Sequence, residues 1–111
     1  PRAMGLDRAL KMTMLAETYP AREAQTLGLV TEVVARGEAL NQSLDLAQRI
    51  AAQSPLAVRL AKGMMTTSMD MTLEQSQREA ALAVMVANPS KDVAEGVRAF
   101  FKKETPIFTG H

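Results

Sequence analysis

Apolar residues recur at helical spacing along most of the chain. Leu6, Leu10 and Met14, for example, share one face of the first segment. The same period and its stop signals predict helices at residues 6–15, 21–27, 38–53, 55–65, 72–87 and 91–103. The chain is therefore expected to be mainly helical, followed by an extended tail in which Pro106 forbids a further helix.

Three of these helices begin at residues suited to capping. Ser54 and Ser90 can accept a hydrogen bond from a free backbone N–H of the first turn. Thr72 and Gln75 have the spacing of a reciprocal capping box. The polar run at residues 66–68 predicts that the helix starting after Ser54 ends before it.

Residues 29–35 form the one predicted strand. Val30, Val33 and Val34 are β-branched and suit an extended backbone. Gly28 can adopt the left-handed conformation that ends the preceding helix. Because a single strand cannot pair its own backbone groups, this segment needs a sheet edge from a larger fold.

The helix at residues 72–87 ends in a stretch, Ala80 to Ala87, that has no polar side chain. A helix that is apolar all round is either wrapped by its own fold or pressed against another subunit. A chain of 111 residues has little material for wrapping. We therefore expect self-association through this stretch, with Leu82 and Val86 facing the partner.

Composition narrows the function classes. The 47% apolar residues argue against disorder, and a net charge of +1 with mixed signs argues against a nucleic-acid or membrane partner. Without cysteine there is no thiolate nucleophile or zinc–thiolate site, and we expect no metal. No apolar run approaches the ~20 residues of a membrane span, and a reducing, cytoplasmic location is expected.

Several motifs in order resemble the C-terminal half of a crotonase, a member of the enoyl-CoA hydratase/isomerase superfamily. The first contains Ala21, Glu23, Ala24, Gly28, Leu29 and Val30. Next come Leu46-Ala47, Ile50-Ala51, Ser54-Pro55, Ala57 and Ala61-Lys62. The closing signature contains Ser90, Asp92, Glu95, Gly96, Ala99, Phe100, Lys103, Pro106 and Phe108. The resemblance covers essentially the whole chain.

The resemblance implies a mainly α segment within an α/β, ClpP/crotonase-like fold. Residues 1–35 would end the spiral core, whose missing strands would pair the predicted strand. Residues 36–111 would form a C-terminal helical region for oligomerisation and the rim of the CoA site. The implied partners are an acyl-CoA substrate and copies of the same chain, as a trimer or a dimer of trimers. No separate cofactor is implied because CoA is part of the substrate.

The resemblance places no catalytic residue in this chain, since the family's oxyanion donors and catalytic glutamates lie upstream of it. It implies that Phe100 and Lys103 line the CoA site, often that of the adjacent subunit. An aromatic face and an ammonium suit the adenine or acyl portion and the phosphates. The alternative is that Phe100 is the last core residue and Lys103 a helix-end charge.

Two further interpretations compete with an enzyme segment. One is a non-catalytic helical interaction module derived from a crotonase tail, and the other, a helical nucleic-acid binder, is disfavoured by the charge balance. The chain also departs from the family pattern at Ala16, where glycine is usual, and at Pro20, where a capping serine is usual. Glu104 stands where an arginine often follows the terminal lysine. These departures affect turn geometry and one basic contact.

Overall fold

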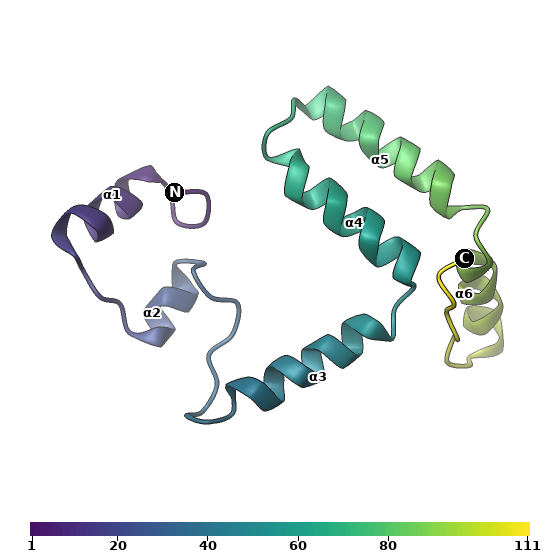
Figure 1. The fold of residues 1–111 in the computed structure, drawn as a ribbon, viewed down its shortest axis with the longest axis horizontal. Helices are drawn as coiled ribbons and strands as arrows, with labels where there is room; N and C mark the ends of the chain where they lie inside the picture. Colours follow the sequence, from purple (N-terminus) through teal and green to yellow (C-terminus); the bar gives the residue numbers. More distant parts are fainter. The chain divides into compact units, whose positions relative to one another are not determined.

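A computed structural model describes all of residues 1–111, and its regular secondary structure is entirely helical (Figure 1). The helices are α1 Leu6–Leu15, α2 Ala21–Thr26, α3 Ala39–Ala51, α4 Pro55–Ser68, α5 Leu73–Ala87 and α6 Lys91–Lys102. All the predicted helices are confirmed; α1 has the predicted bounds and the other five have shifted ends. The chain divides within α3 into two compact units, Pro1–Gln42 and Ser43–His111. The predicted division after residue 35 concerns the larger fold and stays a prediction.

The predicted helix caps are present. The side-chain oxygen of Ser54 accepts from Ala57 N–H at 3.3 Å, and Ser90 caps α6 in the same way. Thr72 and Gln75 form the capping box, with side-chain to backbone distances of 3.2 and 2.9 Å. Each cap satisfies N–H groups that have no partner within the helix, which fixes where α4, α5 and α6 begin.

The predicted end of the helix after Ser54 is wrong, because α4 continues through the polar run to Ser68. The hydroxyl groups there donate back to carbonyls of the preceding turn. Thr66 bonds Lys62 O at 3.0 Å, and Thr67 bonds Gly63 O at 3.0 Å. Since these side chains are satisfied within the helix, they do not compete with it as they would in a turn.

The predicted strand at residues 29–35 is absent, and this segment has no regular secondary structure. Its start is as expected: Gly28 is left-handed, with φ 76°, and ends α2. Gly28 N–H donates to Gln25 O at 3.0 Å and Leu29 N–H to Ala24 O at 2.9 Å, the two bonds of a Schellman motif. No β-ladder forms because a ladder needs a second strand, which this chain does not contain.

Two of the departures from the family pattern have a structural outcome in the first unit. Ala16 ends α1 in the left-handed conformation, with φ 51° and ψ 37°. Glu17 N–H closes the turn on Met12 O at 3.0 Å. Pro20 occupies the N-cap of α2 without a side-chain hydrogen bond. At the turn after α1, alanine therefore adopts the left-handed backbone conformation that glycine usually occupies.

Replacing Ala16 with glycine is expected to stabilise the chain by about 0.5–1 kcal/mol. Removing Cβ relieves the left-handed strain of about 1–2 kcal/mol, against a smaller loss of about 0.5–1 kcal/mol from the more flexible unfolded chain. Urea unfolding followed by circular dichroism would measure the change. Ala9→Gly, in the interior of α1, is the matched control and should destabilise by about 1 kcal/mol. A destabilised Ala16→Gly variant would contradict the observed turn.

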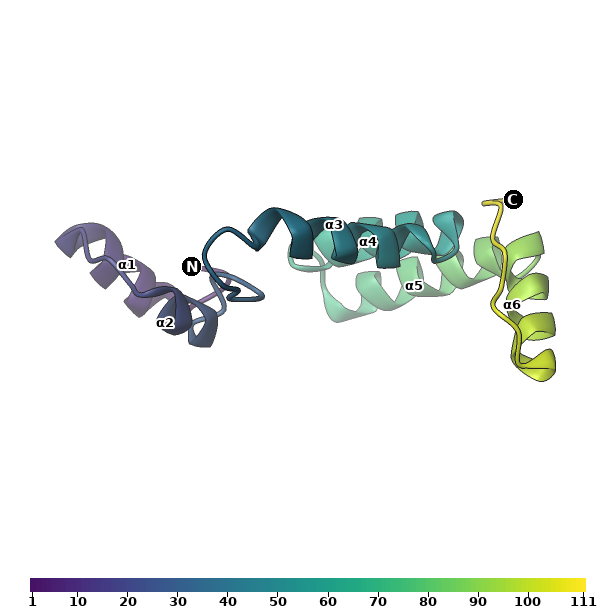
Figure 2. The ribbon, with the colours of Figure 1, turned by 90° about the horizontal axis from the view of Figure 1, so that it is seen from below.

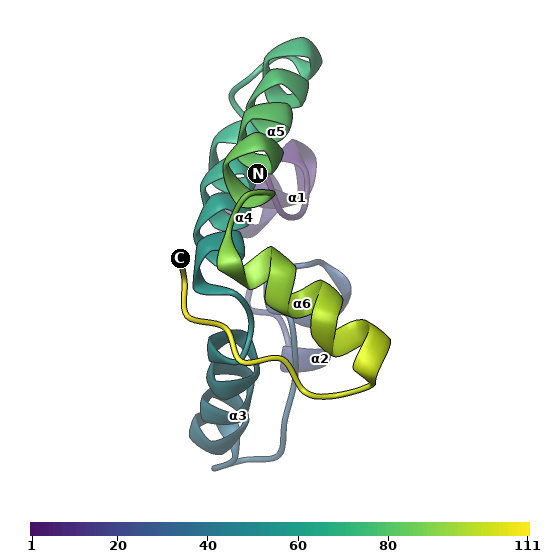
Figure 3. The ribbon, with the colours of Figure 1, turned by 90° about the vertical axis from the view of Figure 1, so that its right-hand side faces the viewer.

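The second unit contains an antiparallel pair and a crossing helix. α4 and α5 run side by side in opposite directions (Figures 1 and 2), with Ala83 of α5 buried. α6 follows after a short turn and runs across the direction of the pair, and the C-terminal tail returns along it (Figure 3). None of the helices is long and apolar enough to cross a membrane. The tail is thus placed beside α6 and near the start of α4.

Little of the apolar surface is covered within the chain. The accessible surface is 9136 Å², whereas a compact protein of 12.0 kDa would expose about 6,000 Å², and two separate compact units of these sizes about 7,000 Å². The buried apolar residues are only Met4, Ala83 and Ala99. The apolar faces of α1, α3 and α5 are largely exposed. The fold therefore exposes more surface than a self-contained protein of this size, and large apolar side chains are among the exposed residues.

Candidate functional site

Asp92 anchors the C-terminal tail. It is 2% exposed, and its carboxylate accepts a 2.6 Å hydrogen bond from the Ser54 hydroxyl at the start of α4. The backbone N–H groups of Thr109 and Gly110 donate to the same carboxylate at 2.7 and 3.1 Å. In return, the carbonyl of His111 accepts from Lys91 N–H at 2.7 Å. The tail is thus tied to the first turn of α6 and, through Asp92, to the cap of α4.

These contacts lower the pKa of Asp92 below its usual value. The Ser54 hydroxyl bond is the largest cause, and the N–H groups of Thr109 and Gly110 add to it. Burial acts in the opposite direction because it penalises the charged form, and the hydrogen bonds outweigh it. Asp92 is therefore held as a carboxylate, the form that can accept from several donors at once.

An apolar cavity of about 390 Å³ adjoins this anchor. Its walls include Leu56 and Ala57 of α4, Val93 and Val97 of α6, and Phe108 of the tail. The Phe108 ring lies 3.6 Å from the position that a Cβ on Gly96 would take. The absence of a side chain at Gly96 lets the tail approach α6 closely, so that Phe108 forms one wall of the cavity.

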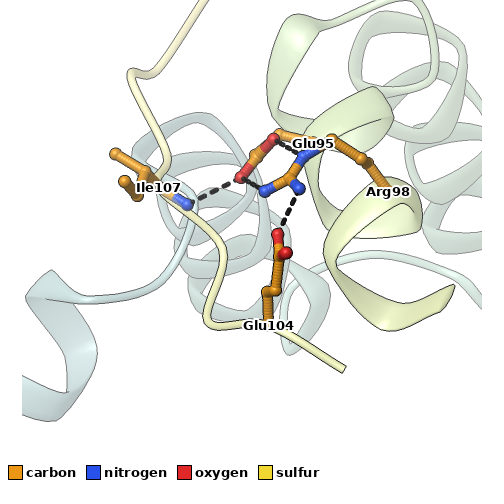
Figure 4. A network of polar contacts seen from close by, with 4 residues as sticks. All are labelled: Glu95, Arg98, Glu104 and Ile107. Carbon is orange, nitrogen blue, oxygen red and sulfur yellow. Dashed lines mark hydrogen bonds and ion pairs between the residues drawn. The ribbon is translucent and has the colours of Figure 1, made fainter. Parts of the chain in front are cut away.

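A second polar network ties the other end of the tail to α6 (Figure 4). Arg98 donates to both carboxylate oxygens of Glu95, from Nε at 2.7 Å and from Nη2 at 2.8 Å. Arg98 Nη1 also bonds the carboxylate of Glu104. Glu95 accepts a further bond from Ile107 N–H at 3.0 Å. The guanidinium and the Ile107 N–H together lower the pKa of Glu95 to about 2, and the two carboxylates raise the pKa of Arg98.

The predicted site residues lie at the end of α6. Lys103 is left-handed, with φ 55° and ψ 38°, and its N–H donates to Phe100 O at 3.3 Å. Glu104 N–H donates to Ala99 O at 3.0 Å, which completes a Schellman motif. Phe100 is 80% exposed, so within this chain it is not a core residue. The exposed Phe101 contacts it edge to face, with ring centroids 5.7 Å apart.

This end of α6 combines an exposed aromatic pair with the side chains of Lys102 and Lys103. An aromatic face can stack on a planar ring, and an ammonium can pair with a phosphate. No group of three or more histidine, cysteine, aspartate or glutamate side chains is placed to hold a metal ion. The side chains at this end of α6 therefore have the chemistry to contact an anionic, partly apolar ligand.

Sequence reasoning missed the roles of Asp92, Glu95 and Arg98. The position of Asp92 in the first turn of α6 predicts only a favourable interaction with the helix dipole. One signal was available in the sequence. Asp92 and Glu95 are three positions apart, so their carboxylates share one helix face, and the eight-residue tail that follows the helix has backbone N–H groups that need acceptors. Periodicity alone does not show that the tail folds back over that face.

The comparisons with known proteins agree with the motifs. The family model described as enoyl-CoA hydratase/isomerase matches residues 1–111. The 2,3-dehydroadipyl-CoA hydratase of Escherichia coli is 33% identical over 109 residues, covering 98% of this chain and 43% of that protein. The (E)-benzylidenesuccinyl-CoA hydratase of Thauera aromatica is 33% identical over 110 residues, covering 99% and 43%.

Solved structures give the same result. The crystal structure of an enoyl-CoA hydratase from Bacillus anthracis superposes with a TM-score of 0.95 at 32% identity, covering 100% of this chain and 43% of that one. The chain thus spans about two fifths of the length of the curated relatives and the solved structure that it matches. Since the family match extends over every residue, the chain belongs to the enoyl-CoA hydratase/isomerase family.

Proposed function

We propose that this chain is the C-terminal part of an enzyme that acts on acyl-CoA thioesters, where it forms the subunit interface and part of the CoA rim. The role in the CoA rim rests on one observation: Phe100 and Lys103, at the end of α6, are both exposed to solvent. Two findings support an acyl-CoA substrate: the family match over residues 1–111, and the alignment of 98% of this chain with the Escherichia coli hydratase.

The proposed reaction passes through an enolate of the thioester. Backbone N–H groups stabilise the enolate oxygen, and one or two glutamates move protons at the neighbouring carbons. This chain supplies none of those groups in our proposal, and alone it is inactive. Its contribution to the rate is indirect, because it helps to hold the CoA portion so that the reacting carbons meet the catalytic groups.

Lys103 would contribute electrostatically at the CoA phosphates. Its ammonium belongs to an exposed side chain at the helix end, and Lys102 precedes it. Phe100, on the same turn, would offer its ring to the adenine or acyl portion. The CoA site that these residues line can be that of the adjacent subunit, because the aromatic side chains at the end of α6 are exposed within their own chain.

The interface role rests on exposed apolar surface. Leu82, Val84, Met85 and Val86 of α5 each have more than half of their surface exposed. Leu82 and Val86 also line a groove of about 420 Å³ between α4 and α5, beside Leu60. We assign this surface to contacts between copies of the chain, in a trimer or a dimer of trimers. A surface of this kind on a soluble particle marks a contact site.

Replacing Lys103 with alanine in the intact protein is expected to weaken coenzyme A binding about fivefold at low salt, equivalent to about 1 kcal/mol. The loss should shrink at about 1 M salt, where charges are screened beyond about 3 Å. Isothermal titration calorimetry with coenzyme A, the part common to all such substrates, measures both values.

Lys91→Ala is the matched control for this experiment, because it removes the same charge from the opposite end of α6. It should leave the dissociation constant unchanged. If Lys103→Ala has no effect at either salt concentration, Lys103 does not line the site. If the intact protein binds no coenzyme A at all, the helical interaction module becomes the better account.

A further inference from the structure

Lys103 takes a backbone conformation that only glycine adopts freely. It is one of two non-glycine residues in the chain with positive φ, the other being Ala16. In L-residues the left-handed conformation brings Cβ close to the following carbonyl, so it persists only where surrounding contacts hold it. For Lys103 those contacts include the Schellman bonds already described, and the side chains of the neighbouring residues add more.

Arg98 links the segments on both sides of this turn (Figure 4). It pairs with Glu95, one turn earlier in α6, through a bidentate contact. It also pairs with Glu104, the residue directly after Lys103. Through Glu95, the same network reaches Ile107 N–H in the tail. One guanidinium therefore connects the helix, the turn and the tail.

The geometry distinguishes this network from an ordinary surface ion pair. Glu74 and Arg78 of α5 form such a pair, a single contact with both side chains 75% exposed. The Glu95 side chain is only 22% exposed and carries three hydrogen bonds, while Arg98 and Glu104 are 40% and 52% exposed and are joined to it in one network. Isolated exposed pairs contribute little, whereas bidentate networks with shielded members hold a fixed geometry.

We propose that Arg98 is a positioning residue, which holds the left-handed turn so that Lys103 is preorganised for the phosphates of coenzyme A. This inference rests on the proposed function of Lys103. It also gives a role to Glu104, which stands where the family often has arginine: here the carboxylate is the second partner of Arg98. A preorganised lysine binds with a smaller loss of conformational freedom than one on a disordered turn.

A double-mutant cycle on the intact protein tests this directly. Arg98→Met is expected to weaken coenzyme A binding about threefold in the wild-type background and to have no effect in the Lys103→Ala background. Arg98→Lys, which keeps one charged contact, should restore part of the lost affinity. Arg78→Met is the matched control and should change nothing in either background.

Hydrogen exchange supplies a second readout on the same proteins. Arg98→Met should increase exchange of the Glu104 and Ile107 amides at least tenfold, and Arg78→Met should not. An equal loss of affinity in both backgrounds, or unchanged exchange at Glu104, would overturn the positioning role and leave the proposed function intact. If Lys103→Ala itself leaves coenzyme A binding unchanged, the inference and the proposed role of Lys103 fail together.

Discussion

Asp92→Ala is expected to release the C-terminal tail from α6 and to remove the wall that Phe108 contributes to the apolar cavity. The substitution removes the carboxylate that accepts from Ser54, Thr109 and Gly110, and leaves these donors without that partner. Buried polar groups that lose their partner are among the largest sources of destabilisation. We expect the amides of Thr109 and Gly110 to exchange at least tenfold faster, and the melting temperature to fall by about 5 °C or more.

Asp45→Ala is the matched control for Asp92→Ala. Asp45 lies on α3, its side chain is 62% exposed, and its contact with Arg49 is 3.9 Å long. That variant should melt within about 2 °C of the wild-type chain, as expected for an exposed pair. Unchanged exchange at Thr109 and Gly110 in Asp92→Ala would mean that the tail is not held by this carboxylate.

The attachment of the tail through Asp92 and Glu95 is expected to depend on pH. The folded pKa values of Asp92 and Glu95 are lowered from usual values of 3.8 and 4.5. Their contribution to stability is therefore fully present above those usual values and is lost as the pH falls through the lower folded values. Tail amides should become exposed to exchange between about pH 4.5 and pH 2, in step with the titration of these groups.

Replacing Leu82 and Val86 together with glutamate is expected to abolish self-association at micromolar concentration. Both side chains are more than half exposed on α5, in the segment without polar residues. Burying two unpaired carboxylates in an apolar interface should weaken association at least ~100-fold. Sedimentation velocity at several protein concentrations would show the loss of the larger species.

Gln77→Glu is the control for the double substitution, because it adds a carboxylate to the same helix outside the apolar segment. It should leave the association unchanged. Far-UV circular dichroism separates dissociation from unfolding, since none of the substitutions replaces Thr72 and Gln75 of the capping box or the buried Ala83. Association that survives both glutamates with helix content intact would assign the interface to another surface.

The helices were predictable from sequence because periodicity and capping are local properties. Ser54, Thr72 and Ser90 cap where expected, and Gly28 is left-handed as predicted. The prediction of a strand at residues 29–35 was wrong, because β-branched residues favour an extended backbone but a β-ladder also needs a second strand, which this chain does not contain. α4 extends beyond its predicted end because threonine and serine hydroxyl groups can donate to carbonyls of the preceding helical turn, and they then do not end the helix.

The site was predictable only in part. The family signature pointed to Phe100 and Lys103, and both lie exposed at the end of α6. The contacts of Asp92 and Glu95 with the tail depend on the tail folding back along α6, which places residues 12 or more positions apart in hydrogen-bond contact. Arg98 bonds Glu95 and Glu104, which are three and six positions away. The local pattern places the carboxylates of Asp92 and Glu95 on one helix face, but it does not show that the tail folds back over that face, so the anchor of the tail appears only in the folded chain.

We propose that the apolar faces of this chain are interfaces. Its exposed surface exceeds that of two compact units by about 2,000 Å², more than twice the area of about 800 Å² that one partner buries in a standard protein–protein interface. The most direct test is sedimentation velocity of the 111-residue chain at micromolar concentration. We predict oligomers whose population grows with concentration, whereas a single monomeric species at every concentration would contradict the account.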